Sequence, residues 1–113
     1  MSSVTTHVLD TGRGRPAAGV PVRLEVKGEG GWLSVGRGAT DEDGRQRDLV
    51  PAGFEFREGD YRLTFDAGAY FAAQGAEGFY TEVTVAFVVR DAGAHYHVPL
   101  LLSPYGCTTY RGS

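Results

Sequence analysis

The segment that determines the fold is residues 20–27, with the sequence VPVRLEVK. Two sets of side chains alternate along it: the apolar Val20, Val22, Leu24 and Val26, and then Pro21, Arg23, Glu25 and Lys27. A period of two is typical of a β-strand with one buried face. A Gly-rich turn at residues 28–31 follows, and WLSV at residues 32–35 then predicts a second strand and a hairpin.

Three more segments alternate in the same way, and we expect strands at residues 61–66, 79–89 and 95–102. The longest of them is 79–89, whose second face includes Ala86 and Val88 and is too apolar for open water, so part of it should meet a partner or another sheet. Only residues 67–75 could form a helix, of at most two turns. Short strands and Gly-rich turns predict an all-β fold, an antiparallel sandwich or barrel.

Composition narrows the function classes. The chain has 113 residues and a net charge of -3, so we expect one domain over residues 1–113 and no nucleic-acid binding. No apolar run is long enough to cross a bilayer, and no secretory signal is visible, so we expect a cytoplasmic protein. The single cysteine, Cys107, should be a small buried residue. A domain of this size is marginally stable alone, and oligomerisation is one way in which such a domain gains stability.

Histidines are the first candidates for chemistry. In the segment HYHVPLLL, Tyr96 and Val98 belong to the apolar face, so His95 and His97 should point out of the fold. Such residues are most often solvated, but two at this spacing could serve catalysis or supply two ligands of a zinc site. His7 shares a strand face with Thr5, which alone is a weak signal.

An arginine and the chain end are further candidates. Arg45 follows the tight turn at Asp43 and Gly44, where it could be functional or simply paired with Asp41 or Asp43. The last residues, YRGS at 110–113, could fray, but their tyrosine and arginine favour an end held against folded structure. The motifs typical of nucleotide cradles, serine-hydrolase elbows and thiolate metal clusters do not occur.

Five segments taken together resemble one family. They are TTHVLD at 5–10, GRPAAG at 14–19, TDEDGR at 40–45, HYHVPLL at 95–101 and YRGS at 110–113. They resemble the 5-hydroxyisourate hydrolases, the transthyretin-related enzymes of urate breakdown. The resemblance implies an all-β, transthyretin-like (prealbumin-like) two-sheet sandwich of about eight strands with one short α-helix. It also implies a homotetramer, a dimer of dimers, with active sites at the subunit interface.

The same resemblance implies an activity and its residues. The activity is hydrolysis of 5-hydroxyisourate to 2-oxo-4-hydroxy-4-carboxy-5-ureidoimidazoline by histidine-assisted water attack on a cyclic amide, without a cofactor or metal. The implied catalytic residues are His7, Arg45, His97 and Ser113, and the implied substrate-binding residues are His7, Arg45, Tyr110 and Arg111. His95 would support them.

Two questions stay open at the level of sequence. Either His7 or His97 could activate the water, and we expect the Ser113 carboxylate to raise histidine basicity. Gly106 and Cys107 depart from the family pattern, which affects local strand pairing and the channel shape. The alternatives are a transthyretin-like carrier of small molecules and a structural or adhesive sandwich domain.

Overall fold

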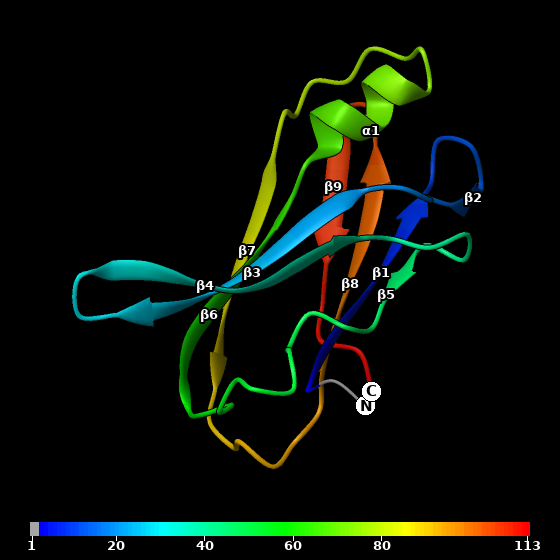
Figure 1. Cartoon of the computed structure of the whole chain (residues 1–113). Helices are drawn as coiled ribbons and strands as arrows, with labels where there is room; N and C mark the ends of the chain where they lie inside the picture. The colour runs from blue at the N-terminus through cyan, green and yellow to red at the C-terminus, as the bar shows by residue number, and fades with distance from the viewer. Residues whose placement is uncertain (1–2) are drawn as a thin grey trace.

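The computed structural model of the chain describes residues 3–113, in which two β-sheets pack face to face and one helix lies at an end of the sandwich (Figure 1). The first sheet contains β1 (Val4–Asp10), β2 (Arg15–Pro16), β5 (Arg45–Gln46), β8 (Tyr96–Ser103) and β9 (Gly106–Thr109). The second contains β3 (Pro21–Gly28), β4 (Gly31–Ala39), β6 (Gly59–Phe65) and β7 (Val83–Val89). The helix is α1 (Ala67–Ala73). The predicted two-sheet sandwich with one short helix is confirmed, with nine strands in residues 3–113 where about eight were expected.

The hairpin, the helix and the core follow the sequence pattern. Strands β3 and β4 pair antiparallel as predicted, and α1 lies within the predicted segment, capped by the Asp66 carboxylate, which accepts from the Ala69 amide at 2.9 Å. Leu24, Leu63 and Leu100 are fully buried between the two sheets. The alternation of period two therefore identified the core face of each sheet correctly.

The expectation of a purely antiparallel sandwich is wrong at one pair of strands. Strands β1 and β8 run parallel over seven residue pairs, from Val4 opposite Tyr96 to Asp10 opposite Leu102 (Figure 1). A parallel pair needs a long connection, and here most of the chain lies between the two strands. Local alternation cannot reveal such a pairing, because it contains no information about distant partners.

The predicted long strand at 79–89 is shorter in the structure. Strand β7 begins at Val83, which pairs with Phe65, the last residue of β6. Beyond that point the chain of β6 turns into α1, so residues 79–82 have no strand partner there. The amide of Phe79 instead donates to the carbonyl of Pro104 at 2.7 Å.

The prediction that Cys107 is buried is also wrong. Cys107 lies on β9, a four-residue strand at the edge of the first sheet, and its side chain is exposed. Opposite it, Leu102 of β8 is buried. The difference arises because β9 is at the rim of the sandwich.

Within residues 3–113, no helix is long and apolar enough to span a membrane.

A buried polar contact attaches α1 to the end of β1. The Tyr70 hydroxyl donates to Oδ2 of Asp10 at 2.6 Å, and the Arg13 amide donates to Oδ1 at 3.0 Å. Both Asp10 and Tyr70 are 3% exposed. Burial, together with the Asp10 carboxylate, raises the pKa of Tyr70 to about 12, so the hydroxyl keeps its proton and remains a donor.

Replacing Tyr70 with phenylalanine should therefore destabilise the fold. Tyr70→Phe leaves one oxygen of a buried carboxylate without a donor, which costs about 1.5–3 kcal/mol of the free energy of unfolding. Urea denaturation measures this difference. The control is Tyr105→Phe, because Tyr105 is 70% exposed and its loss should change little. Equal midpoints for the two variants would contradict the role of this contact.

Candidate active site

Strand register brings distant polar residues together on the outer face of the first sheet. Thr5 of β1 lies opposite His97 of β8, and His7 lies opposite Arg45 of β5. Opposed residues of paired strands project to the same side of a sheet, and residues two apart on one strand do so too. Val4, Thr6 and Val8 occupy the buried side. The histidines therefore point out of the sandwich, as the alternation predicted.

A pocket of about 230 Å³ opens on this face. It is lined by Thr5, Thr6, Arg45, Arg47, His95, His97 and Ser113. These residues come from the beginning, the middle and the end of the chain. Two guanidinium groups and two imidazoles line the pocket without any Asp or Glu side chain, so it suits an electron-rich ligand.

Thr5 links the two histidines of β8. Its hydroxyl oxygen lies 2.9 Å from Nε2 of His95 and 2.8 Å from Nδ1 of His97. Thr5 is 7% exposed, whereas His95 is exposed and His97 is half-buried. The hydroxyl therefore fixes one nitrogen of each ring, and Nε2 of His97 is the ring nitrogen left for other partners.

A tight turn positions Arg45. Oδ1 of Asp41 accepts from the amides of Asp43 and Arg45, and Oδ2 pairs with Arg47 at 3.2 Å. The hydrogen bond from the Arg45 amide is the main reason that the pKa of Asp41 is lowered. Gly44 completes the turn at φ 78°, and a Cβ there would overlap the carbonyl oxygen of Val8.

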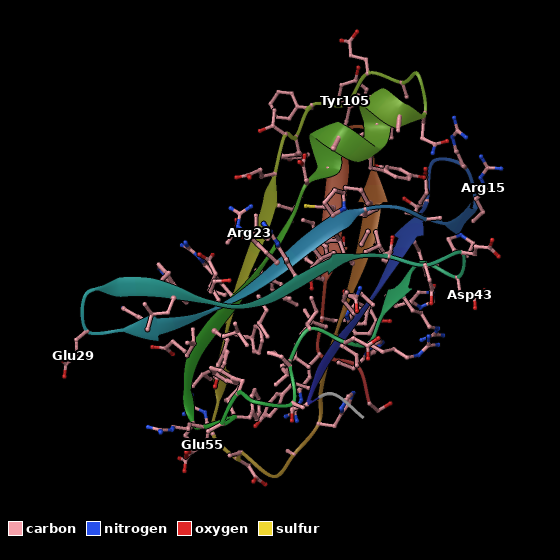
Figure 2. All side chains as sticks on the ribbon, viewed as in Figure 1. Arg15, Arg23, Glu29, Asp43, Glu55 and Tyr105 are labelled. Carbon is pink, nitrogen blue, oxygen red and sulfur yellow. The ribbon has the colours of Figure 1, made fainter. Side chains whose placement is uncertain are left out.

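The guanidinium of Arg45 forms no ion pair with any residue in 3–113. Asp41, which was one expected partner, uses its carboxylate for backbone amides and for Arg47 instead. Asp43, which Figure 2 shows at the turn before β5, makes no ion pair in the described residues either. The reading of Arg45 as a paired surface arginine is therefore wrong, and its charge is available to a ligand in the pocket.

His7 lies beside the pocket rather than in its lining. Its Nε2 donates to the carbonyl oxygen of Asp43 at 2.8 Å, so this nitrogen carries a hydrogen. His7 is half-buried next to Arg45.

The chain end is attached to β8, which confirms the expectation that it does not fray. The Gly112 amide donates to the His97 carbonyl at 2.8 Å. A Cβ on Gly112 would lie 2.6 Å from Cδ2 of His97, so only glycine allows the tail to pass so close to the imidazole. This contact brings Ser113 into the pocket beside the histidines.

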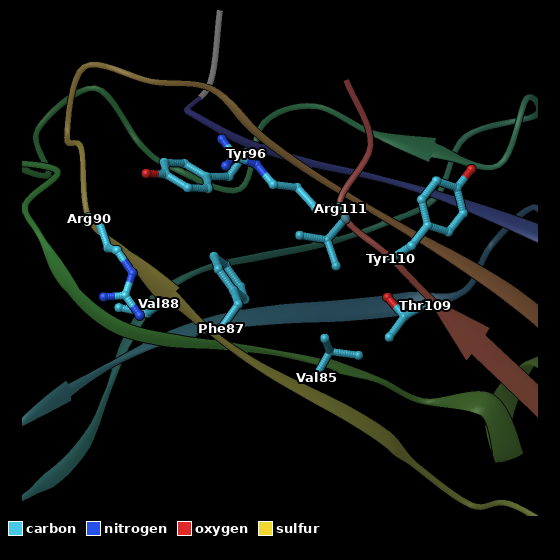
Figure 3. A pocket seen from close by; sticks show the side chains of 9 residues that line it. Val85, Phe87, Val88, Arg90, Tyr96, Thr109, Tyr110 and Arg111 are labelled. Carbon is cyan, nitrogen blue, oxygen red and sulfur yellow. The ribbon is translucent and has the colours of Figure 1, made fainter.

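Tyr110 and Arg111 line a different cavity, of about 480 Å³, between the edges of the two sheets (Figure 3). Its other lining residues are Val85, Phe87, Val88, Arg90, Tyr96, Val98 and Thr109. The Arg111 guanidinium lies 4.6 Å from the ring centroid of Tyr96, a cation–π contact. Within one chain, the structure therefore does not bring Tyr110 and Arg111 into the pocket that holds His97.

The pocket lowers the pKa of His97 below the usual 6.5. Burial is the main cause, and the positive charges of Arg45, His95 and His7 act in the same direction. A hydrogen bond with the backbone of Thr5 acts in the opposite direction. No ion pair joins Ser113 and His97 within residues 3–113, and the expected effect of the Ser113 carboxylate on histidine basicity stays a prediction. His97 is neutral at pH 7.

The zinc alternative finds no assembled ligand set. Within residues 3–113, no group of three or more His, Cys, Asp or Glu side chains is placed to hold a metal ion. One nitrogen of each histidine faces Thr5 or the Asp43 carbonyl.

Sequence reasoning missed Thr5 and Arg47 as parts of this site. Thr5 was visible only as a neighbour of His7 on one strand face.

Comparisons with known proteins identify the family. The model of the HIUase/Transthyretin family matches residues 4–112. The chain belongs to the HIUase/Transthyretin family. A 5-hydroxyisourate hydrolase from Salmonella dublin is 46% identical over 97% of this chain and 80% of its own length. This confirms the resemblance that the five sequence motifs indicated.

Solved structures of the HIUase/Transthyretin family include both an enzyme and a transthyretin. The 5-hydroxyisourate hydrolase of Klebsiella pneumoniae superposes with a TM-score of 0.83, at 37% identity and with all of both chains covered. The transthyretin of Sparus aurata superposes with a TM-score of 0.91, at 32% identity, over 99% of this chain and 97% of its own. The fold alone therefore does not separate the two kinds of protein.

Removing the charge of Arg45 should raise the pKa of His97. In Arg45→Gln, the second-largest cause of the lowered pKa is absent, so the His97 imidazole should titrate closer to its usual value. The measurement is an NMR titration of the ring protons. Arg47→Gln is the matched control, since Arg47 lines the same pocket but is paired with Asp41. If both variants moved the titration equally, a specific effect of Arg45 would be contradicted.

Proposed function

We propose that this chain hydrolyses 5-hydroxyisourate to 2-oxo-4-hydroxy-4-carboxy-5-ureidoimidazoline in urate degradation. The observation that carries the proposal is that neutral His97 shares a pocket with Ser113 and with Arg45, which has no ion pair among residues 3–113. The curated relative from Salmonella dublin, named 5-hydroxyisourate hydrolase, supports the same activity.

His97 is the residue that we assign to water activation. It is half-buried, it is neutral at pH 7, and its Nε2 has no hydrogen-bond partner among residues 3–113. A neutral imidazole can take a proton from water while the oxygen attacks a carbonyl carbon. His7 suits a positioning role instead, because its Nε2 hydrogen is already bound by the Asp43 carbonyl.

Arg45 stabilises the charge that this attack creates. As the water oxygen bonds to the carbonyl carbon, the carbonyl oxygen becomes negative, and a guanidinium with paired donors can bind it. The ring C–N bond then breaks, and the leaving nitrogen takes back the proton that His97 accepted. Ser113 adds a hydroxyl next to the imidazoles. These steps need no cofactor.

The carrier alternative accounts less well for this pocket. A carrier of small apolar molecules has no use for a half-buried imidazole beside a guanidinium that has no ion pair in the described part of the chain. The structure of sea bream transthyretin in complex with thyroxine shows that the fold can serve such a role. The residues that distinguish this chain are therefore those of the site, not those of the core.

The direct test follows the decay of freshly made 5-hydroxyisourate by its ultraviolet absorbance. The wild-type chain should accelerate the decay, and His97→Gln should lose about 100-fold or more of kcat, because general-base catalysis contributes about 10²- to 10⁴-fold. The control is Arg23→Gln on the outer face of the second sheet. A wild-type rate equal to the spontaneous rate would refute the proposed function.

We further propose that four copies assemble as a dimer of dimers with the sites between them. Strands β7 and β9 are edge strands, with backbone groups that have no strand partner on one side among the described residues. The cavity between these edges is lined mainly by apolar side chains, and Val88 is 40% exposed. Assembly would cover these surfaces and could bring Tyr110 and Arg111 of one copy towards substrate in another.

Sedimentation measures this assembly. The wild-type chain should sediment with four times the 12.1 kDa mass of one copy. Val88→Asp should shift the mass towards smaller species, because it places a charge in the apolar edge. Leu33→Asp is the control, since Leu33 is 59% exposed on the β3–β4 hairpin, away from that edge. A wild-type chain that sediments as a monomer would disprove the assembly.

A further inference from the structure

The geometry around Thr5 limits which nitrogens of His95 and His97 can carry a hydrogen. One hydroxyl lies within hydrogen-bond distance of two imidazole nitrogens, at 2.9 Å from Nε2 of His95 and 2.8 Å from Nδ1 of His97. A threonine hydroxyl has a single hydrogen to donate. When Thr5 donates to one ring, the other ring must donate its N–H to the Thr5 oxygen. The protonation states of the two histidines are therefore coupled through Thr5.

We propose that Thr5 relays a proton from His97 to His95 when His97 activates water. The inference rests on the proposed function and deepens it. In the resting state, the Nδ1 hydrogen of His97 is donated to Thr5, and the Thr5 hydroxyl is donated to the bare Nε2 of His95. Thr5 and His95 act through His97 and are positioning residues, since neither is required to touch the reacting atoms.

The relay conserves protons and charge. One water proton bonds to Nε2 of His97, the Nδ1 hydrogen of His97 moves to the Thr5 oxygen, and the Thr5 hydrogen moves to His95. Three bonds to hydrogen break and three form. The hydroxide bonds to the carbonyl carbon, and the positive charge ends on His95. When the ring C–N bond breaks, the same movements run backwards, and Nε2 of His97 protonates the leaving nitrogen.

The surroundings of the two rings explain the direction. His97 is half-buried near Arg45, and both features disfavour a positive charge on it. His95 is exposed, so water can solvate the charge there. Thr5 itself is 7% exposed, which protects the bridge from competing water. A base that passes its proton on does not have to hold a charge in an unfavourable place.

The kinetic test compares hydroxyl-bearing and hydroxyl-free variants of Thr5. Thr5→Val keeps the shape and the strand preference but has no proton to pass, so kcat should fall about 10-fold or more, with KM little changed. Thr5→Ser should restore most of kcat. Thr84→Val is the control, because Thr84 is an exposed threonine on the other sheet. A Thr5→Val enzyme with the wild-type kcat, or a Thr5→Ser enzyme as slow as Thr5→Val, would overturn the relay.

Two readouts separate a relay from simple packing. In mixtures of light and heavy water, kcat of the wild-type chain should curve with the deuterium fraction, because several protons move together, and the Thr5→Val rate should be linear. A linear wild-type plot would overturn the relay. Nitrogen NMR of labelled histidines should also show hydrogen on Nδ1 of His97 and none on Nε2 of His95, in neutral rings.

The NMR result does not depend on activity. A wild-type chain that leaves 5-hydroxyisourate unchanged would refute the proposed function, and the order of hydrogens from His97 through Thr5 to His95 would still be judged by these ring protons. Hydrogen found on Nε2 of His95, with Nδ1 of His97 bare, would overturn the proposed direction. The two failures are therefore distinguishable.

Discussion

The site depends on the parallel pairing of β1 with β8. This pairing places Thr5 opposite His97, and the pairing of β1 with β5 places His7 opposite Arg45. Because side chains alternate between the faces of a sheet, a slip of one residue would turn Thr5 into the core and Thr6 outwards. The buried Val4 and Val8 make such a slip costly. The hydrophobic core thus maintains the register that the polar site requires.

The charge of Arg45 is available in the pocket because the nearby carboxylate of Asp41 is bound to other groups. The carboxylate of Asp41, four residues before Arg45, binds backbone amides and Arg47 instead of the Arg45 guanidinium. Arg45 is consequently left without an ion pair in the described residues, and its charge helps to keep His97 neutral. A general base must be unprotonated before it can accept a proton. Arg45 therefore favours the reactive, neutral form of His97 and can also bind a developing negative charge.

The polar pocket and the apolar cavity suit different purposes. The polar pocket lies on the outer face of the first sheet, while the apolar cavity lies between β7 and β9 (Figure 3). The chain end contributes to both, since Tyr110 and Arg111 line the cavity and Ser113 lines the pocket. Association of copies at the cavity would therefore involve the same tail that contributes Ser113 to the polar pocket.

Local sequence was enough to determine the sheet faces, the β3–β4 hairpin and the short helix, because alternation, a Gly-rich turn and a run of helix-forming residues each involve only neighbours along the chain. It also placed His7, His95 and His97 on outward faces, and the motifs identified the family. Only the tertiary structure decided that β1 and β8 run parallel, that Cys107 is exposed at an edge, and that Thr5 bridges two histidines. Each of these depends on which distant strand lies alongside, and the packing of the whole chain selects that partner.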